Sequence, residues 1–246
     1  MSQTPQAVLI IGATGGIGAA LARKLAASGT ALFLMARREE PLAALAAELG
    51  AGYAVGDATD WTEIDRVVDL AKAHLGTLSG IANCVGSLIL KPAHLTRFEE
   101  FQQTIAQNLT SAFGVVRAAA RVMTDGGSVV LCSTAASRIG LPNHEAIAAA
   151  KGGVNGLVLS AAATYASRNL RVNAVAPGLV ATPLTARITG SAPAVQASQG
   201  MHALGRIGQP EDVAGLMAWL LSPEATWVTG QLYGVDGGLG TVRAAR

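Results

Sequence analysis

The stretch that most constrains the fold is residues 7–18, where a run of apolar residues ends abruptly in glycines. Such a run predicts a buried parallel strand that enters a tight turn and then a helix. Gly12, Gly16 and Gly18 follow the spacing G-x-x-x-G-x-G. Because a helix N-terminus offers free N–H groups and partial positive charge, this turn predicts a phosphate site. A purely structural strand-to-helix turn is the alternative.

Each of the three glycines has its own predicted role. Gly12 leaves the strand in a conformation that residues with a Cβ avoid. Gly16 leaves room for a pyrophosphate to approach the backbone, and Gly18 lets the helix lie close to the sheet.

The composition limits the classes of protein to consider. The chain has 246 residues, of which 50% are hydrophobic and 14% charged. This predicts one domain with a large core, as in an α/β fold whose doubly wound sheet is buried on both faces. The net charge of +2 and the scarcity of aromatic residues favour neither nucleic acid nor an anionic membrane as partner. A small molecule is the expected partner.

The first residues predict neither a signal peptide nor a membrane span. Residues 2–6 carry no positive charge, and glycines and Thr14 interrupt the apolar run that follows. A cytoplasmic location is therefore expected. Cys84 and Cys132 each end an apolar run and are predicted to be buried thiols. The four histidines do not have the spacing of metal ligands, so no metal is expected.

The chain alternates between strand and helix patterns without repeats or linkers, which predicts one βα-alternating unit over residues 1–246. Residues 182–208 show no clean period and are predicted to be an irregular, mobile lid over the substrate. Strands are expected near 7–11, 31–35, 52–55, 78–82, 128–132, 170–174 and 231–235, and helices near 17–28, 41–49, 61–74, 98–123, 145–167 and 210–221.

The end of the second strand bears on the choice of cofactor. An acidic residue there would bind the ribose 2′-OH of NAD, but the chain has Arg37 and Arg38. Two arginines suit a 2′-phosphate, so NADP(H) is favoured over NAD(H), although the arginines could also be merely solvated. Asp57 follows the third strand, where it could bond the adenine amino group. Asp60 has the spacing of a helix N-cap.

Polar residues also follow the later strands, at the edge where open α/β sheets bind ligands. Asn83 and Gly86 follow the fourth strand, and Ser133 and Thr134 follow the fifth. Lys151 lies in a helix rich in small residues, where few charges surround it. Asn108 lies in the long helix, where such a residue usually has a local or surface role.

These stretches together resemble the short-chain dehydrogenase/reductase family over essentially the whole chain. The resemblance implies a single-domain Rossmann fold with a seven-stranded parallel sheet, a nicotinamide cofactor and commonly a homotetramer, with a homodimer as the alternative. It also implies that Val180 and Thr182 lie beside the nicotinamide. The motifs that carry it are residues 12–18, 83–86, Asn108, 171–178, 204–214 and 235–238. The residues expected to bind the cofactor are Gly12, Thr14, Gly15, Gly16, Ile17, Gly18, Arg37, Arg38, Asp57, Asn83, Val85, Gly86, Lys151, Pro177, Gly178, Val180 and Thr182.

The catalytic centre departs from the family pattern. The resemblance implies a proton-transferring tyrosine four residues before Lys151, but that position holds Ile147. The position of the family's serine, which polarises the substrate oxygen, holds Thr134 with Ser133 beside it, and Asn108 matches the asparagine of the water relay. A threonine retains the hydroxyl, whereas an isoleucine neither donates nor accepts a proton.

Three proton sources remain: His144, Lys151 acting through water, and the substrate itself. His144 would share one helical face with Ile147 and Lys151 if the helix began early enough. Otherwise it would be an ordinary loop histidine.

The function expected from these features is an NADP(H)-dependent oxidoreductase for a carbonyl or alcohol substrate, with an atypical proton donor. One alternative is a catalytically impaired NADP-binding sensor or subunit partner. Another is reduction of an activated C=C or C=N bond, which needs no tyrosine. Residues 87–95 and 183–205 are mostly small or apolar, so the substrate is expected to be uncharged or partly apolar.

Overall fold

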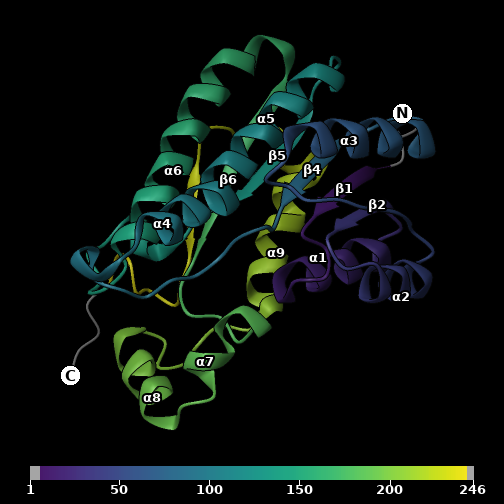
Figure 1. Cartoon of the computed structure of the whole chain (residues 1–246). Coiled ribbons are helices and arrows are strands. Elements are labelled where there is room, and N and C mark those ends of the chain that lie inside the picture. The colour runs from purple at the N-terminus through teal and green to yellow at the C-terminus, as the bar shows by residue number, and fades with distance from the viewer. Residues whose placement is uncertain (1–5, 243–246) are drawn as a thin grey trace.

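The computed structural model describes residues 6–242 and shows one parallel sheet with helices on both faces (Figure 1). The sheet has seven strands in the order β3-β2-β1-β4-β5-β6-β7. From β1 the chain builds outward to β3 and then returns to the other side of β1, so ligands are expected outside the carboxyl ends of β1 and β4. The strands are β1 (Ala7–Ile11), β2 (Ala31–Ala36), β3 (Gly52–Val55), β4 (Gly80–Asn83), β5 (Gly127–Cys132), β6 (Leu170–Pro177) and β7 (Leu232–Val235).

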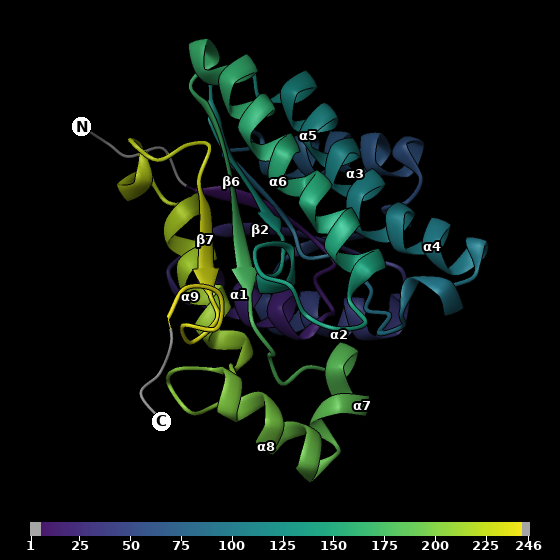
Figure 2. The ribbon, with the colours of Figure 1, turned by 90° about the vertical axis from the view of Figure 1, so that its left-hand side faces the viewer.

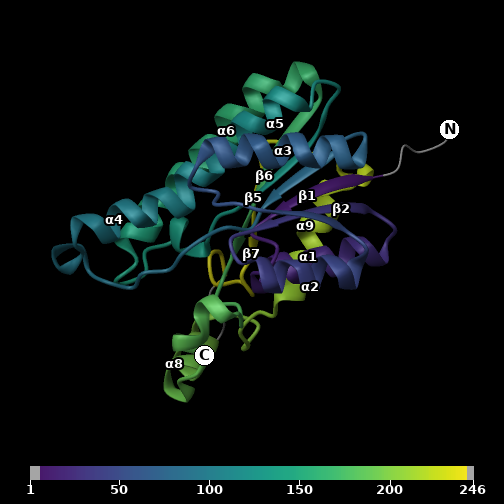
Figure 3. The same ribbon diagram turned by 45° about the vertical axis from the view of Figure 1, so that its right-hand side comes forward.

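The main helices form a layer on each face of the sheet (Figures 1 and 3). One layer consists of α1 (Gly16–Ala27), α2 (Glu39–Leu49) and α9 (Pro210–Leu221). The other consists of α3 (Trp61–Leu75), α5 (Ser111–Val122) and α6 (Glu145–Tyr165).

The buried apolar residues accordingly form two core layers. In β1, Leu9 and Ile11 belong to one layer, and Val8 and Ile10 belong to the other. All four have no exposed surface. A strand that is buried on both faces needs apolar residues at every position, and this explains the uninterrupted run in the sequence. The predicted doubly wound α/β fold is confirmed.

The helix predicted over 98–123 is interrupted. It consists of α4 (Phe98–Ile105), a π-helical turn (Ala106–Thr110) and α5. Such turns insert one residue into a helix and occur frequently at functional sites. Asn108 lies within this turn and is buried, so the surface role that is usual for a helical asparagine does not apply.

The segment 182–208 was predicted to be irregular, and that prediction was wrong for much of its length. It contains α7 (Ala186–Thr189) and α8 (Ala192–Met201), which lie beyond the carboxyl ends of β6 and β7 (Figure 2). Because α8 consists largely of small residues, its sequence shows no clear helical period of apolar side chains. Buried His202 at its end bonds Ser198 O through Nδ1 (2.6 Å), and its Nε2 accepts the N–H of Leu179 (3.2 Å). This imidazole ties α8 to the end of β6.

One helix of the described residues, Glu145–Arg168, is long and apolar enough by composition to cross a membrane. It packs against β6 and α5, and 44% of its most apolar window is buried. Core helices of soluble proteins pass the same test, so the helix is weak evidence for a membrane span.

Candidate active site

The glycine turn between β1 and α1 is closed by contacts that exclude side chains. Gly12 has φ = +82°, in the left-handed region, and a Cβ there would lie 2.9 Å from the backbone of Cys84. A Cβ on Gly18 would overlap the carbonyl oxygen of Gly12. The close approach predicted for Gly18 is therefore to the turn itself rather than to the sheet.

The start of α1 fits a pyrophosphate. No side chain caps the helix at Gly15, and its first turn has no acidic residue. Free N–H groups therefore face the space beyond the turn without a competing carboxylate. A Cβ on Gly16 would lie 2.7 Å from the methyl group of Thr182, so these distant segments meet here. Thr14 is half-buried beside them, and Ile17 lines the adjoining cavity.

Arg37 and Arg38 follow the carboxyl end of β2, and both are exposed. Neither guanidinium forms an ion pair with any residue of the described part. Both groups are therefore free to bind a phosphate or to remain solvated.

The two aspartates beyond β3 differ in their surroundings. Asp57 Oδ1 accepts hydrogen bonds from the N–H and the hydroxyl of Thr59, both at 2.9 Å, so one carboxylate oxygen is already used. Asp60 accepts from Thr62 N at 2.8 Å at the start of α3, and the bonds from Thr62 lower the pKa of Asp60. The predicted N-cap is confirmed.

Asn83 orders the loop that follows β4. Its side-chain oxygen accepts the N–H of Val85 at 3.1 Å, and its amide nitrogen donates to Ser111 Oγ at 3.4 Å. Asn83 is almost fully buried, whereas Val85 lines the cavity. The amide of Asn83 thus shapes the loop that presents Val85.

Gly86 lies beside both Asn108 and Lys151 and leaves room for their side chains. A Cβ on Gly86 would lie 3.1 Å from Asn108 Oδ1 and 3.7 Å from Lys151 Nζ. The Asn108 amide donates to Thr104 O and Ser87 Oγ, both at 2.9 Å. The π-helical turn therefore aims Asn108 at the loop beyond β4, in the same cavity as Lys151.

Lys151 is 5% exposed, and its Nζ donates to the carbonyl oxygen of Cys132 at 2.6 Å. It forms no ion pair with a carboxylate of the described residues. Burial without a carboxylate lowers the pKa of this amine. Its remaining N–H groups lie at the cavity, where the hydroxyl groups of a ligand would satisfy them.

The structure separates the two neighbouring hydroxyls that end β5. Ser133 Oγ donates to Asn155 Oδ1 at 2.6 Å and lies 3.1 Å from Ser137 Oγ. Thr134 Oγ1 accepts only a 3.3 Å bond from Ala136 N within the described residues. Both line the cavity, but Thr134 still has a hydroxyl proton to give to a ligand.

His144 lies just outside α6, which begins at Glu145. The condition for a shared helical face with Ile147 and Lys151 is therefore not met. All three nevertheless line one cavity, because the residue before the helix still turns toward it. The Nδ1 of His144 lies 2.7 Å from Pro142 O, which fixes a proton on Nδ1 and leaves Nε2 as the reactive nitrogen.

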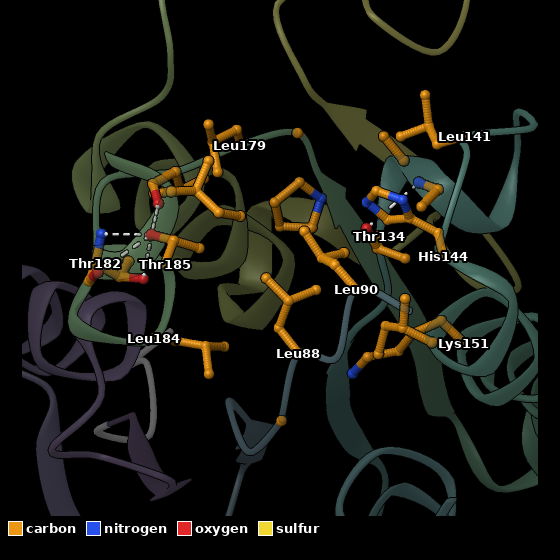
Figure 4. A pocket seen from close by; sticks show the side chains of 18 of the residues that line it. Leu88, Leu90, Thr134, Leu141, His144, Lys151, Leu179, Thr182, Leu184 and Thr185 are labelled. Carbon is orange, nitrogen blue, oxygen red and sulfur yellow. Dashed lines mark hydrogen bonds between the residues drawn. The ribbon is translucent and has the colours of Figure 1, made fainter. Parts of the chain in front are cut away.

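The cavity that these residues line has a volume of about 490 Å³. In Figure 4, Thr134, His144 and Lys151 lie on one side, and Leu179, Thr182 and Leu184 lie on the other. Leu88 and Leu90 lie between the two sides. Ile147 is 3% exposed and adds a further apolar surface to the cavity. The walls are therefore mainly apolar, with few polar groups.

The chain beyond β6 closes the cavity toward α1. Pro177, Gly178, Val180 and Thr182 all line it. Val180 pairs with Gly208 as an isolated bridge, and the hydroxyls of Thr182 and Thr185 lie 3.1 Å apart. This network holds Thr182 over the glycine turn.

Several residues that shape the site carry no recognisable signal in the sequence. Ser87 and Asn155 hold Asn108 and Ser133, and His202 holds the segment before Val180. These partners are far apart in the chain, and no spacing signals them. Within residues 6–242 no group of three or more His, Cys, Asp or Glu side chains is placed to hold a metal ion.

Comparison with known proteins defines the class to which this site belongs. A family model described as "Enoyl-(Acyl carrier protein) reductase" matches residues 12–240. A solved structure of a short-chain type dehydrogenase/reductase from Mycobacterium ulcerans superposes with a TM-score of 0.93 at 32% identity, covering 99% of this chain and 93% of that one. The chain belongs to the short-chain dehydrogenase/reductase family. Its class is that of oxidoreductases that act on alcohol and carbonyl groups of small molecules with a nicotinamide cofactor.

Two curated relatives show the range of activities among similar chains. 3beta-Hydroxysteroid dehydrogenase 1 of Eggerthella lenta is 34% identical over 241 residues, which are 94% of this chain and 92% of that protein. Cis-4-hydroxycyclohexanecarboxylate dehydrogenase of Sinomonas cyclohexanicum is 35% identical over 237 residues, 94% of each chain.

Proposed function

We propose that this protein is an NADP(H)-dependent oxidoreductase that interconverts a ketone and an alcohol on an apolar small molecule, with His144 as its proton donor. The observation that carries the proposal is the orientation of His144. Its Nδ1 is engaged by Pro142 O, so Nε2 is the nitrogen that exchanges a proton in a cavity shared with Thr134 and Lys151.

The cofactor site follows from the contacts described above. The uncapped N-terminus of α1 suits the pyrophosphate, the free guanidinium groups of Arg37 and Arg38 suit a 2′-phosphate, and the buried amine of Lys151 suits ribose hydroxyls. When bound, NADPH supplies the hydride. The Val180–Gly208 bridge and the Thr182–Thr185 contact support Val180 and Thr182 as the residues that would border the nicotinamide.

The protein's own groups manage the charge on the substrate oxygen. The hydroxyl of Thr134 donates a hydrogen bond to that oxygen and polarises the carbonyl while keeping its proton. The imidazolium form of His144 then transfers the Nε2 proton while Pro142 O stabilises Nδ1–H. Lys151, held by Cys132 O, contributes positive charge nearby. Ile147 excludes water from this part of the cavity but takes no part in proton transfer.

The substrate class follows from the walls of the cavity. Leu88, Leu90, Leu141, Leu179 and Leu184 line it. Among residues 6–242, the titratable side chains that line it are those of His144, Lys151, His202 and the two cysteines. The two relatives named above act, by their names, on a hydroxysteroid and a hydroxycyclohexane ring. We infer an uncharged or partly apolar substrate, with a cyclic ketone as the first class to test.

The decisive experiment measures NADPH oxidation over a panel of apolar ketones for the wild type, His144→Ala and His144→Asn. Loss of a general acid lowers kcat by about 10²–10⁴-fold. NADPH affinity is expected to stay unchanged in both variants, because His144 lies in the substrate half of the cavity. Turnover that is unchanged in both variants would remove His144 from the mechanism and leave Lys151 with water, or the substrate itself, as the proton source.

A second candidate function rests on Ile147, which fills the tyrosine position with a buried aliphatic side chain. In this case the protein binds NADP(H) as a sensor or subunit partner without hydride transfer. NADPH binding that changes the assembly, with no turnover of any ketone or of activated C=C and C=N compounds, would favour this function.

A further inference from the structure

Two cysteines lie opposite each other at the carboxyl edge of the sheet. Strands β4 and β5 pair in parallel up to Asn83 opposite Leu131, so the next pair in this register is Cys84 and Cys132. Cys84 is still held in the sheet, because its N–H donates to Ile11 O at 2.8 Å, and Cys132 pairs with Val175 on its other side.

This register brings the two thiols within reach of each other. Adjacent strands lie about 4.8 Å apart, inside the range of about 4.4–6.8 Å between the Cα atoms of a disulfide. Paired residues of parallel strands point to the same face, and both Cys84 and Cys132 line the cavity of the active site. They are also the only two cysteines of the chain, and both are free.

The surroundings make the two thiols unequal. The neighbouring Cys84 thiol and the positive charge of Lys151 lower the pKa of Cys132. The neighbouring Cys132 and burial raise the pKa of Cys84. Lys151 is held at this place by its bond to the Cys132 carbonyl oxygen. The pair therefore places Cys132, whose pKa is lowered, beside both a second thiol and the amine of Lys151, an arrangement that favours oxidation.

We propose that Cys84 and Cys132 form an oxidation site for hydrogen peroxide, in which Cys132 is attacked first and Cys84 resolves it as an intramolecular disulfide. The Cys132 thiolate attacks one peroxide oxygen, the O–O bond breaks, and the departing hydroxide takes up a proton to leave as water. The resulting sulfenic acid is attacked by the Cys84 sulfur. The S–O bond breaks, the S–S bond forms, and a second water leaves with the Cys84 proton. Overall, two thiols lose two electrons and two protons to one peroxide.

Neither thiol takes part in the hydride or proton steps proposed above, so this inference stands independently of them.

Reduced full-length protein is exposed to hydrogen peroxide at neutral pH, quenched with catalase, unfolded and alkylated. Intact mass is then measured before and after dithiothreitol. We expect a monomeric product that is two hydrogens lighter, takes up no alkyl group, and regains both alkylation sites on reduction.

The single variants Cys84→Ser and Cys132→Ser test the assigned order of attack. Cys84→Ser keeps a hydroxyl donor beside Cys132, so we expect a sulfenic acid at Cys132 that dimedone traps. In Cys132→Ser, the remaining thiol of Cys84 is expected to stay alkylatable after the same exposure. Equal dimedone labelling of Cys84→Ser and Cys132→Ser would overturn the order of attack. Two intact thiols in oxidised wild type, a disulfide between two chains, or oxygen addition without a cross-link would overturn the site itself.

Discussion

At the scale of single residues, the active site is defined by one substitution and by what surrounds it. Ile147 stands where the resemblance to the family predicts a tyrosine hydroxyl, and it lines one cavity with Lys151, Thr134 and Asn108. His144 lies in the same cavity. Its Nδ1 bonds the carbonyl oxygen of Pro142, so its Nε2 is the nitrogen that can exchange a proton there. The polar groups predicted to surround a tyrosine are therefore present in the cavity, which supports the proposed change of proton route over its loss.

Restoring the tyrosine tests this interpretation. In a His144→Ala background, Ile147→Tyr is expected to recover most of the lost turnover, about 10²–10⁴-fold, because Lys151 is in place to lower the pKa of the new phenol. The measurement is kcat for NADPH oxidation with one ketone, alongside Ile147→Phe as the matched control without a hydroxyl. Equal rates for the Tyr and Phe variants would contradict this interpretation.

A second prediction at this scale concerns cofactor choice. A hydrogen bond to a charged group contributes about 1.5–3 kcal/mol, so losing one phosphate contact weakens binding about 10- to 100-fold. We expect at least one of the variants Arg37→Ala and Arg38→Ala to raise the Kd of NADP⁺ by this factor. The Kd of NAD⁺ should change by no more than about twofold in either variant. Titration calorimetry with both dinucleotides checks it. If neither variant discriminates between them, both arginines are simply solvated.

At the scale of elements, the site depends on how loops are attached to helices. The loop 87–95, which carries Leu88 and Leu90, is anchored to α4 through Lys91, whose Nζ bonds both carboxylate oxygens of Glu100 at 2.8–2.9 Å. Glu100 also accepts the N–H of Arg97 at the start of α4. These bonds join the substrate loop to the helix that leads to Asn108.

This anchor predicts a pH dependence. The bonds from Lys91 and Arg97 lower the pKa of Glu100 to about 2. Because its folded pKa is depressed, the stabilisation is fully present above the ordinary pKa of 4.5 and is lost as the pH falls toward 2. We expect Glu100→Gln to be less stable than wild type at pH 7 and to differ less from it near pH 2.

Urea unfolding at both pH values measures this difference. The exposed Glu99→Gln on the same helix turn serves as the control, because Glu99 forms no ion pair with the described residues. If the free energy of unfolding of Glu100→Gln differed from that of wild type by the same amount at every acidic pH, the role of the carboxylate charge would be contradicted.

At the scale of the whole molecule, α5 and α6 leave apolar side chains in solvent. Leu159 on α6 is 64% exposed, and Phe113 on α5 is 48% exposed although its ring stacks on that of Trp61 in α3. Exposed apolar side chains are candidate contacts between subunits when they join into a larger patch. We propose a homotetramer of single-domain subunits in the cytoplasm, with a homodimer as the alternative assembly.

The assembly is tested by Leu159→Lys, which places a charge on this surface. We expect the variant to form smaller species than wild type in light scattering coupled to gel filtration, with its helical content unchanged. Leu70→Lys on α3, where Leu70 is 43% exposed, is the matched control and should leave the assembly intact. A monomeric wild type would refute the proposed oligomer.

The sequence by itself determined the fold, and it predicts the phosphate-binding turn and the absent tyrosine. All three depend on local patterns: apolar runs, glycine spacing and the distance from Ile147 to Lys151. Only the tertiary structure decided which residues work together. It directed the Ser133 hydroxyl to Asn155, left that of Thr134 free, brought His144 into the cavity from outside α6, and placed Cys84 opposite Cys132. These relations arise where the carboxyl ends of separate parallel strands meet, and contacts between distant segments leave no period or spacing in the chain.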